Sequence, residues 1–256
     1  MIKILQGNCI DKIKELDDNS IDCVVSSPPY FGLRDYGVDG QFGLEKTYQE
    51  YIANTVKVFE TFKPKLKDTA TIWWNVGDSY SSGSRKTTTN QTLRGDSELV
   101  SIRPQPVNSI KEKDLIGIPW KVAFALQADG WYLRQDIIWH KPNPMPESVK
   151  DRCTKSHEYI FLLSKNAHYY FDQEAIKVES SQSTEIRNKN KFNGAFKGQF
   201  KGTPNEKRWQ EGRPIDEPKF SIDGKSNKRS VWTVTTKPYS EAHFATYPHD
   251  LIIPCI

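Results

Sequence analysis

The chain has 256 residues, which is enough for one large α/β domain or for one domain with a small insertion. Its mean hydropathy of −0.67 and its 36% of hydrophobic residues are low for a well-buried core and indicate long polar loops. The sequence contains neither an apolar run of membrane-spanning length nor the layout of a signal peptide. Its four scattered cysteines form no Cys-x-x-Cys pair, which argues against a zinc site or a disulfide framework and fits a reducing cytoplasm.

Positive charge is concentrated in one segment. Residues 181–230 contain 12 Lys and Arg against 6 Asp and Glu, a net charge of +6 in a chain whose total is +4. A surface that contacts phosphates needs such a concentration of positive charge. A solvated, lysine-rich loop is the alternative explanation.

The first predicted elements form a β-α-β unit. Residues 2–6 are expected to form a short strand, residues 9–16 a helix with one apolar face, and residues 21–26 a buried strand. This order is typical of a parallel sheet with helices on its faces. A second helix is predicted over residues 48–62, and another strand over residues 69–76.

The rest of the chain alternates predicted elements with long polar segments. Residues 81–114 are rich in Ser, Thr, Asn and Arg and are expected to form a mobile loop. Prolines exclude regular structure between residues 140 and 152. The remaining predicted elements are a helix over residues 120–127, strands over 131–139, 157–164 and 231–234, and a helix over 248–253.

The segment Ser27-Pro28-Pro29-Tyr30 directly follows the predicted strand of residues 21–26. Proline fixes φ and lacks an N–H, so the carbonyl groups at this corner point outward as acceptors. A flat ring can stack on Tyr30 while its amino group donates to Ser27 and to a neighbouring carbonyl. This arrangement suits a base extruded from a duplex. A structural Pro-Pro turn that closes the strand is the alternative.

Ser-Pro-Pro-Tyr after a hydrophobic strand resembles the catalytic motif of the amino-group DNA methyltransferases, which methylate the exocyclic nitrogen of cytosine or adenine. Further segments occur here in the order of that family, and the match covers nearly the whole chain apart from residues 180–230. The motif order is the permuted, or β-type, order. The further segments that occur in the family's order are Gly7-Asn8-Cys9, residues 74–80, residues 139–146 and residues 243–248.

The resemblance implies an α/β fold with the Rossmann-like sheet of S-adenosylmethionine-dependent methyltransferases, incomplete at the C-terminus and carrying a basic recognition insert. Residues 1–170 would form the catalytic domain, with residues 81–114 as a mobile loop that is disordered or ordered only on DNA. Residues 171–230 would form the target-recognition insert. Residues 231–256 would return the chain to the cofactor half.

The resemblance also implies how the motif acts. Ser27 and the Pro28 carbonyl would accept from the target amino group, Pro29 would complete the rigid corner, and Tyr30 would stack on the base. Acceptors on both amino hydrogens localise the lone pair of the nitrogen, and the methyl group passes in line from a sulfonium. No covalent intermediate with the enzyme is required.

Cofactor contacts are expected at several strand ends. Asn8 stands where the family usually has an acidic residue, and its amide can accept from the adenine of S-adenosylmethionine or only cap the following helix. Asp78 is expected to line the base or cofactor pocket, or to be a turn residue bonded to its own backbone. The complete set of cofactor-binding candidates is Gly7, Asn8, Cys9, Asp78, His243, Phe244 and Ala245, with a purely structural role as the alternative for His243.

Double-stranded DNA is the expected partner, and no metal or membrane is implied. The proline-stiffened loop that begins at residue 141 would grip phosphates near the flipped nucleotide. The aromatic and basic residues of the insert would read the sequence or form a small core. The DNA-binding candidates are Arg34, Tyr36, Lys141, Asn143, Lys150, Arg152, Lys207 and Arg208.

The family continues beyond the position of Ile256 with a glycine-rich Asp-Pro-Phe-x-Gly-x-Gly motif, which does not occur in these 256 residues. We therefore expect this chain alone to bind S-adenosylmethionine weakly or not at all. It would be a truncated methyltransferase, or a second polypeptide would supply the remaining half. Isothermal titration with the cofactor tests this, because clean one-to-one micromolar binding would refute it.

Serine rather than aspartate before the prolines favours N4 of cytosine as the methylated atom, in a restriction-modification or phage-type enzyme of a prokaryotic cytoplasm. Methylation of adenine N6 is the alternative within the same reaction class. An inactive DNA-binding remnant or subunit, and a methyltransferase that acts on RNA or protein, are the alternatives from other classes.

Overall fold

The computed structural model describes residues 2–81, 110–180, 224–237 and 246–256. The chain forms two compact units: residues 1–170 together with 230–256, and residues 171–229. The first unit contains a five-stranded sheet in the order β1-β2-β4-β3-β7. Its strands are β1 (Ile21–Ser26), β2 (Leu66–Val76), β3 (Tyr132–His140), β4 (His157–Ser164) and β7 (Val231–Thr233).

The sheet is mixed, although the sequence led us to expect a parallel one. β1 and β2 are parallel, as are β3 and β7, but β4 lies antiparallel to both β2 and β3. The predicted α/β class is confirmed. The parallel prediction was wrong for β4: residues 141–156 connect β3 to β4 without a helix, whereas a parallel crossover usually contains one, and β4 returns as the antiparallel neighbour of β3.

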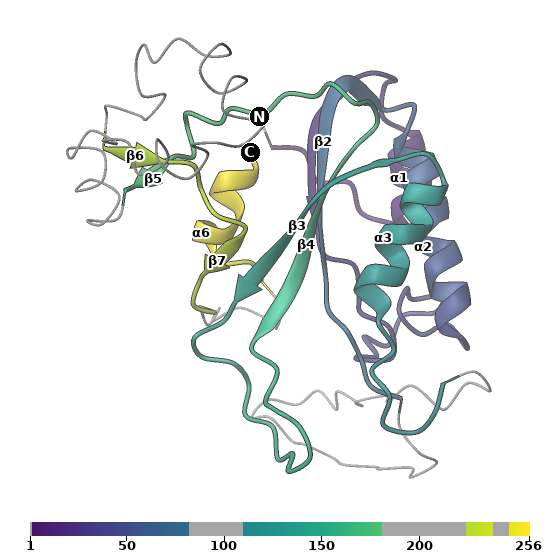
Figure 1. Cartoon of the computed structure of the whole chain (residues 1–256). Coiled ribbons are helices and arrows are strands. Elements are labelled where there is room, and N and C mark those ends of the chain that lie inside the picture. Colours follow the sequence, from purple (N-terminus) through teal and green to yellow (C-terminus); the bar gives the residue numbers. More distant parts are fainter. Residues whose placement is uncertain (1, 82–109, 181–223, 238–245) are drawn as a thin grey trace, which may run out of the picture. The chain divides into compact units, whose positions relative to one another are not determined.

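Helices cover both faces of this sheet (Figure 1). Helices α1, α2 and α3 lie on one face, and the short C-terminal helix α6 lies on the other. α2 begins where the Thr47 side chain accepts from the Glu50 amide, and Pro119 occupies the first turn of α3. The helices are α1 (Cys9–Lys14), α2 (Tyr48–Phe62), α3 (Ile118–Ala128), α6 (His249–Ile252) and the 3₁₀ turn η1 (Ile253–Cys255).

Residues 2–6 form no strand, contrary to the prediction. Ile2 and Ile4 are 92% and 87% exposed, and no strand of the described residues pairs with this segment. An extended segment is stabilised by hydrogen bonds to a neighbouring strand, so an apolar alternation alone does not produce one. Within the described residues, β1 is consequently an edge strand that pairs with β2.

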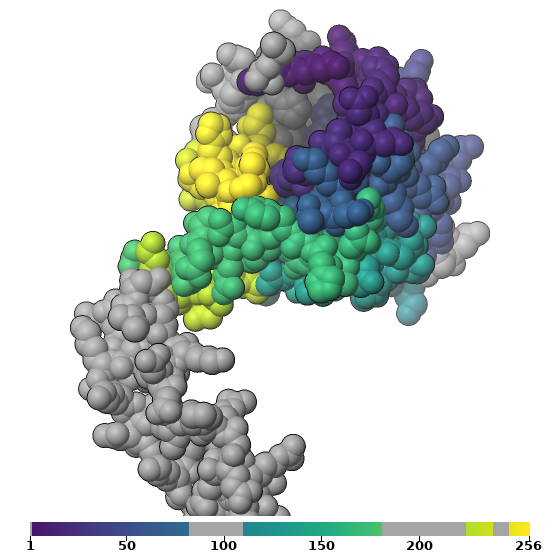
Figure 2. Space-filling model, turned by 90° about the horizontal axis from the view of Figure 1, so that it is seen from above, coloured from purple at the N-terminus to yellow at the C-terminus, as the bar shows by residue number. Residues whose placement is uncertain are grey.

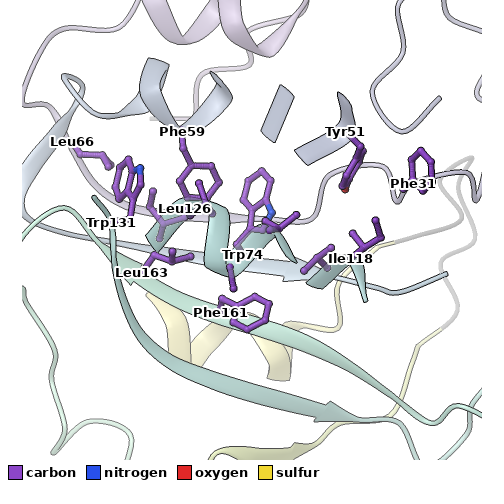
Figure 3. Close-up of a cluster of buried hydrophobic side chains, with 14 of the residues drawn as sticks. Phe31, Tyr51, Phe59, Leu66, Trp74, Ile118, Leu126, Trp131, Phe161 and Leu163 are labelled. Atoms are coloured by element: carbon purple, nitrogen blue, oxygen red, sulfur yellow. The ribbon is translucent and has the colours of Figure 1, made fainter. Parts of the chain in front are cut away.

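The larger core lies between the sheet and helices α2 and α3 (Figure 3). Phe59 of α2 is fully buried and packs edge-to-face on Trp74 and Trp131, with ring centroids 4.9 and 5.3 Å away. Phe161 of β4 lies in the same cluster. Edge-to-face aromatic packing adds stabilisation beyond the burial of area, so this cluster fixes α2 on the sheet.

The opposite face of the sheet carries a smaller core. Trp73 points away from its neighbour Trp74 because successive strand side chains alternate, and it packs near Trp232 with ring centroids 6.1 Å apart. Leu251 and Cys255 close this cluster. The C-terminal residues that supply them are yellow in Figure 2. β2 is therefore buried on both faces, as expected of an inner strand.

In the second unit, the described residues form one short antiparallel pair, β5 (Val178–Glu179) with β6 (Lys225–Ser226). Residues 181–223 lie outside the described part, as do residues 82–109 of the predicted mobile loop. Target recognition by residues 171–230 therefore stays a prediction. Every helix of the described residues is too short or too polar to cross a bilayer.

Candidate active site

Polar side chains from four strands lie together at one end of the five-stranded sheet, where the parallel strands have their carboxyl ends. Parallel strands β1 and β2 end there, β3 ends there beside Lys141, and the antiparallel strand β4 begins there with His157 and Glu158. Ser27 to Tyr30 follow β1 directly, and Asn75 is the penultimate residue of β2. In open α/β sheets, ligands bind outside the carboxyl ends of the parallel strands.

Tyr30 is the centre of this polar cluster. Its hydroxyl oxygen lies 2.6 Å from Glu158 Oε2, 3.1 Å from Asn75 Oδ1 and 3.3 Å from Ser27 Oγ. Burial raises the pKa of the Tyr30 hydroxyl well above its usual value, and the neighbouring Glu158 carboxylate raises it further. Tyr30 is therefore a neutral donor, and its hydroxyl end is directed into the protein.

Gly77 lets the Tyr30 ring reach this position. A Cβ atom on Gly77 would lie 2.4 Å from Tyr30 Cε2, which is closer than two non-bonded carbon atoms can approach. The glycine after β2 is thus required by the ring that crosses it. The Cδ2–Cε2 side of the Tyr30 ring packs against the backbone at Gly77. Stacking of a base on the ring stays a prediction.

Glu158 also forms an ion pair with Lys141. Each of the two side chains is 18% exposed, and Glu158 Oε1 accepts from Lys141 Nζ. Lys141 Nζ also lies 4.1 Å from the centre of the Trp139 ring. We predicted Lys141 as a phosphate contact, but its charge has an internal partner here, so that role stays a prediction without support from this geometry.

Lys155 and Tyr247 lie at the same cluster. Desolvation lowers the pKa of the half-buried Lys155, against the opposing effect of the nearby carboxylates of Asp78 and Glu158. The hydroxyl of Tyr247 is buried close to Ser27, and burial raises the pKa of this hydroxyl, against the opposing effect of the Ser27 side chain. The cluster therefore combines two lysines, two carboxylates and several neutral hydroxyl or amide groups.

Asp78 has a structural role at the start of α3. Its Oδ1 accepts from the amides of Ser79, Gly117 and Ile118 at 2.9, 3.0 and 2.9 Å, so it neutralises the N-terminus of α3. This geometry resembles the alternative given for Asp78, a turn residue bonded to its own backbone, with amides at the start of α3 as additional donors. A pocket role for Asp78 stays a prediction.

Gly7, Asn8 and Cys9 line a hollow of about 1070 Å³ together with the loop of residues 35–45. The Asn8 side chain caps α1 by accepting from the Ile10 amide at 3.0 Å, which leaves its amide nitrogen without a role in the cap. Three carboxylates also line this hollow and were not among the predicted site residues: Asp35, Asp39 and Glu45.

The predicted DNA-binding residues differ in their surroundings. Arg152 lies 2.5 Å from Glu147 and stacks over Tyr80, and the Asn143 amide exchanges two hydrogen bonds with the backbone of Thr236. By contrast, Tyr36 and Lys150 are exposed and Arg34 is half-buried. The candidates outside the described residues are Lys207, Arg208, His243, Phe244 and Ala245.

Sequence reasoning missed Glu158 and Asn75. Glu158 is a charged residue at the start of the otherwise apolar strand β4, and such an isolated charge is a signal that could have drawn attention to it. Asn75 is likewise a buried amide within a hydrophobic run, 3% exposed. A buried polar residue in a central strand needs a partner, and here both residues bind Tyr30.

Comparisons with known proteins identify the family of this chain. The model of the N6_N4_Mtase family, described as DNA methylase, matches residues 21–256. Type II methyltransferase M.Cfr9I of Citrobacter freundii is 42% identical over 99% of this chain and 71% of its own length. Type II methyltransferase M.SmaI of Serratia marcescens is 43% identical over 99% of this chain and 74% of its own length.

Solved structures that resemble the chain include the PvuII DNA methyltransferase (cytosine-N4-specific), with a TM-score of 0.45 and 17% identity over 65% of this chain and 50% of that one. A putative DNA modification methylase from Thermus thermophilus, complexed with S-adenosyl-L-methionine, has a TM-score of 0.43 and 17% identity over 66% and 56% of the two chains. The family match and the two bacterial relatives, each covered over more than two thirds of its length, confirm the resemblance. The chain belongs to the amino-group (N6/N4) family of DNA methylases.

Proposed function

We propose that this member of the DNA methylase family transfers the methyl group of S-adenosylmethionine to N4 of cytosine in duplex DNA, as the modification enzyme of a type II restriction-modification system. One observation carries the proposal: Ser27 opens a rigid Pro-Pro corner at the sheet edge where Tyr30, Asn75 and Glu158 meet. The names of the two bacterial relatives support the type II assignment.

The corner supplies acceptors for an amino group. The Pro29 carbonyl already accepts from the Tyr51 hydroxyl at 3.2 Å, which leaves the Pro28 carbonyl and Ser27 Oγ for the substrate. With both amino hydrogens held, the lone pair of the nitrogen is localised toward the incoming methyl group. Orientation then supplies much of the remaining rate enhancement.

The hollow beside Gly7, Asn8 and Cys9 fits the cofactor in the sign of its charge. S-adenosylmethionine supplies an electrophilic methyl group from a sulfonium, and it also carries an ammonium group. The carboxylates of Asp35, Asp39 and Glu45 line the hollow, together with one lysine, Lys57, and their net negative charge suits these cationic groups. We assign the cofactor to this side of the corner, with His243, Phe244 and Ala245 as further contacts implied by the family.

DNA contacts in this proposal come from exposed residues. Tyr36 and Lys150 are free to meet the duplex, and residues 171–230 would read the sequence with Lys207 and Arg208 among the phosphate contacts. Arg152 and Lys141 would instead keep the loop of residues 141–156 in shape through their ion pairs.

Nucleoside analysis tests the choice of base. DNA is incubated with the protein and with methyl-labelled S-adenosylmethionine at a concentration that fills even a weak site, because we expect weak cofactor binding. The DNA is then digested to nucleosides, which are separated by mass spectrometry. We expect labelled N4-methylcytosine, and we expect Ser27→Ala to lower its rate of formation by about tenfold or more, because one acceptor of the amino group is lost. Labelled N6-methyladenine would overturn the cytosine assignment, and binding of DNA without any methyl transfer would favour the inactive DNA-binding remnant.

A further inference from the structure

Glu158 lies at the centre of the site, and the catalytic motif gives it no role. Its carboxylate makes two contacts: one oxygen lies 2.6 Å from the Tyr30 hydroxyl, and the other accepts from Lys141 Nζ. The side chain is 18% exposed, and it reaches the motif from a strand 128 residues away in the sequence. An acid kept this far from water needs a structural or functional reason.

The Tyr30 hydroxyl has one proton and three oxygen neighbours. The Ser27 hydroxyl can donate its own proton to Tyr30, so it does not compete for the Tyr30 proton. Asn75 Oδ1, at 3.1 Å, is a neutral acceptor, whereas Glu158 is an ionised acceptor at 2.6 Å. Hydrogen bonds to charged acceptors are shorter and stronger, so the proton is donated mainly to Glu158.

This bond and Gly77 hold the ring at two places. The Cδ2–Cε2 side of the ring lies against Gly77, where even a methyl group would clash, and the hydroxyl is anchored to Glu158. A tyrosine whose ring packs against the backbone and whose hydroxyl is hydrogen-bonded has little freedom to change rotamer. A platform fixed in this way loses little conformational entropy when a base stacks on it.

We propose that Glu158 is a positioning residue for methyl transfer, which fixes the Tyr30 ring as a preformed stacking platform, with Lys141 as its counter-ion. The inference rests on the proposed function, because it assumes that the Tyr30 ring receives the target base. It also gives Lys141 a different role from the phosphate contact that the sequence indicated.

A double-mutant cycle separates this role from simple stabilisation. The steady-state constants for methyl transfer to DNA are compared for wild type, Tyr30→Phe, Glu158→Ala and the double variant. We expect Glu158→Ala to lower kcat/KM by about tenfold or more, the strength of a hydrogen bond to a charged group. In the Tyr30→Phe background the same change should lower it by less than about twofold, because the bond is already absent.

Two further variants control for folding and charge. Glu158→Gln keeps the shape and a carbonyl acceptor, so it should retain more activity than Glu158→Ala. Asp68→Asn removes a 2.9 Å ion pair with Lys165 near the opposite end of β2 and should leave the constants unchanged. If the losses of Tyr30→Phe and Glu158→Ala multiply in the double variant, Glu158 acts independently of Tyr30 and the inference is overturned.

A spectroscopic readout does not depend on catalysis. The protein is labelled with 3-fluorotyrosine, and the ¹⁹F resonance of Tyr30 is identified by its absence from Tyr30→Phe. We expect that resonance to move in Glu158→Ala and Glu158→Gln and to stay in place in Asp68→Asn. An unmoved resonance overturns the inference, whereas a wild-type protein that is saturated with S-adenosylmethionine and transfers no methyl group to cytosine overturns the proposed function.

Discussion

At the residue scale, the two halves of the candidate site differ in how visible they are in the sequence. Ser27 to Tyr30 are contiguous, so a local motif reveals the corner. Its partners Asn75 and Glu158 are distant in the chain, and strand pairing brings them to Tyr30. The same limit applies to Lys141, because the sequence shows a basic residue on a loop but does not show the carboxylate that neutralises it.

Gly77→Ala tests the close approach of Tyr30. Because Gly77 does not have a positive φ, the added methyl group acts through its clash with the ring, and we expect the free energy of unfolding to fall by about 1–3 kcal/mol. Methyl transfer should fall as well, since the ring is displaced. Urea unfolding and the kcat/KM for DNA measure the two effects.

The matched control is Gly130→Ala, at the turn after α3, where the atom nearest to an added methyl group is Lys63 Nζ at 4.0 Å but the backbone has φ +93°. This variant should lose about 1 kcal/mol through backbone strain, with no displacement of the Tyr30 ring. Equal effects of the two substitutions on activity would contradict the proposed packing of Tyr30 on Gly77.

At the scale of elements, continuous apolar patterns predicted correctly and isolated ones did not. Helix α2 and strand β4 have the predicted bounds because their patterns are long and their buried faces are well defined. Residues 2–6 have a similar alternation but no described partner strand, and they stay extended and exposed. The orientation of β4 was also hidden, because a hydrophobic run does not specify whether its neighbours run parallel.

Phe59→Ala tests how strongly α2 depends on the aromatic core. Phe59 is fully buried against Trp74 and Trp131, so its truncation should lower the free energy of unfolding by about 3–5 kcal/mol. Phe124→Ala on α3 is the matched control, because that ring is 57% exposed and its loss should cost less than about 1 kcal/mol. Chemical denaturation followed by tryptophan fluorescence compares them, and equal costs would contradict this core.

At the scale of the whole molecule, the length was compatible with one large α/β domain or with one domain and a small insertion, and the chain forms two compact units. The low hydropathy predicted long polar loops, and this stays a prediction for residues 82–109 and 181–223, which lie outside the described residues. Both clusters of buried side chains lie on the one five-stranded sheet. The basic insert is a different case, because its charge predicts contact with phosphate but not a conformation.

Stability at high pH is a property of the whole unit. Burial is the main cause that raises the pKa values of Tyr30, Tyr51 and Tyr247, so the folded state keeps protons that the unfolded chain loses near pH 10. Their stabilising contribution is complete below about pH 10 and is lost as the pH rises further. Urea titrations should give equal free energies of unfolding at pH 8 and 9 and a lower one at pH 10.5.

Tyr30→Phe should reduce the fall in the free energy of unfolding above pH 10, because phenylalanine has no hydroxyl proton and only two of the three buried tyrosines remain. The change should be visible as a smaller difference between the free energies at pH 9 and pH 10.5 than in the wild type. A free energy of unfolding that rises above pH 10 would contradict the assignment of neutral, buried tyrosines.

The place of β4 between β2 and β3 has a consequence for synthesis of the protein. The strand order means that β4 must insert beside β2 after β3 has emerged from the ribosome, and only then does Glu158 reach Tyr30. A nascent chain that has already displayed the whole Ser-Pro-Pro-Tyr segment therefore still lacks the anchor of its aromatic ring. Under the proposed function, competence for base capture would be acquired late in translation, well after the residues of the Ser-Pro-Pro-Tyr segment have been made.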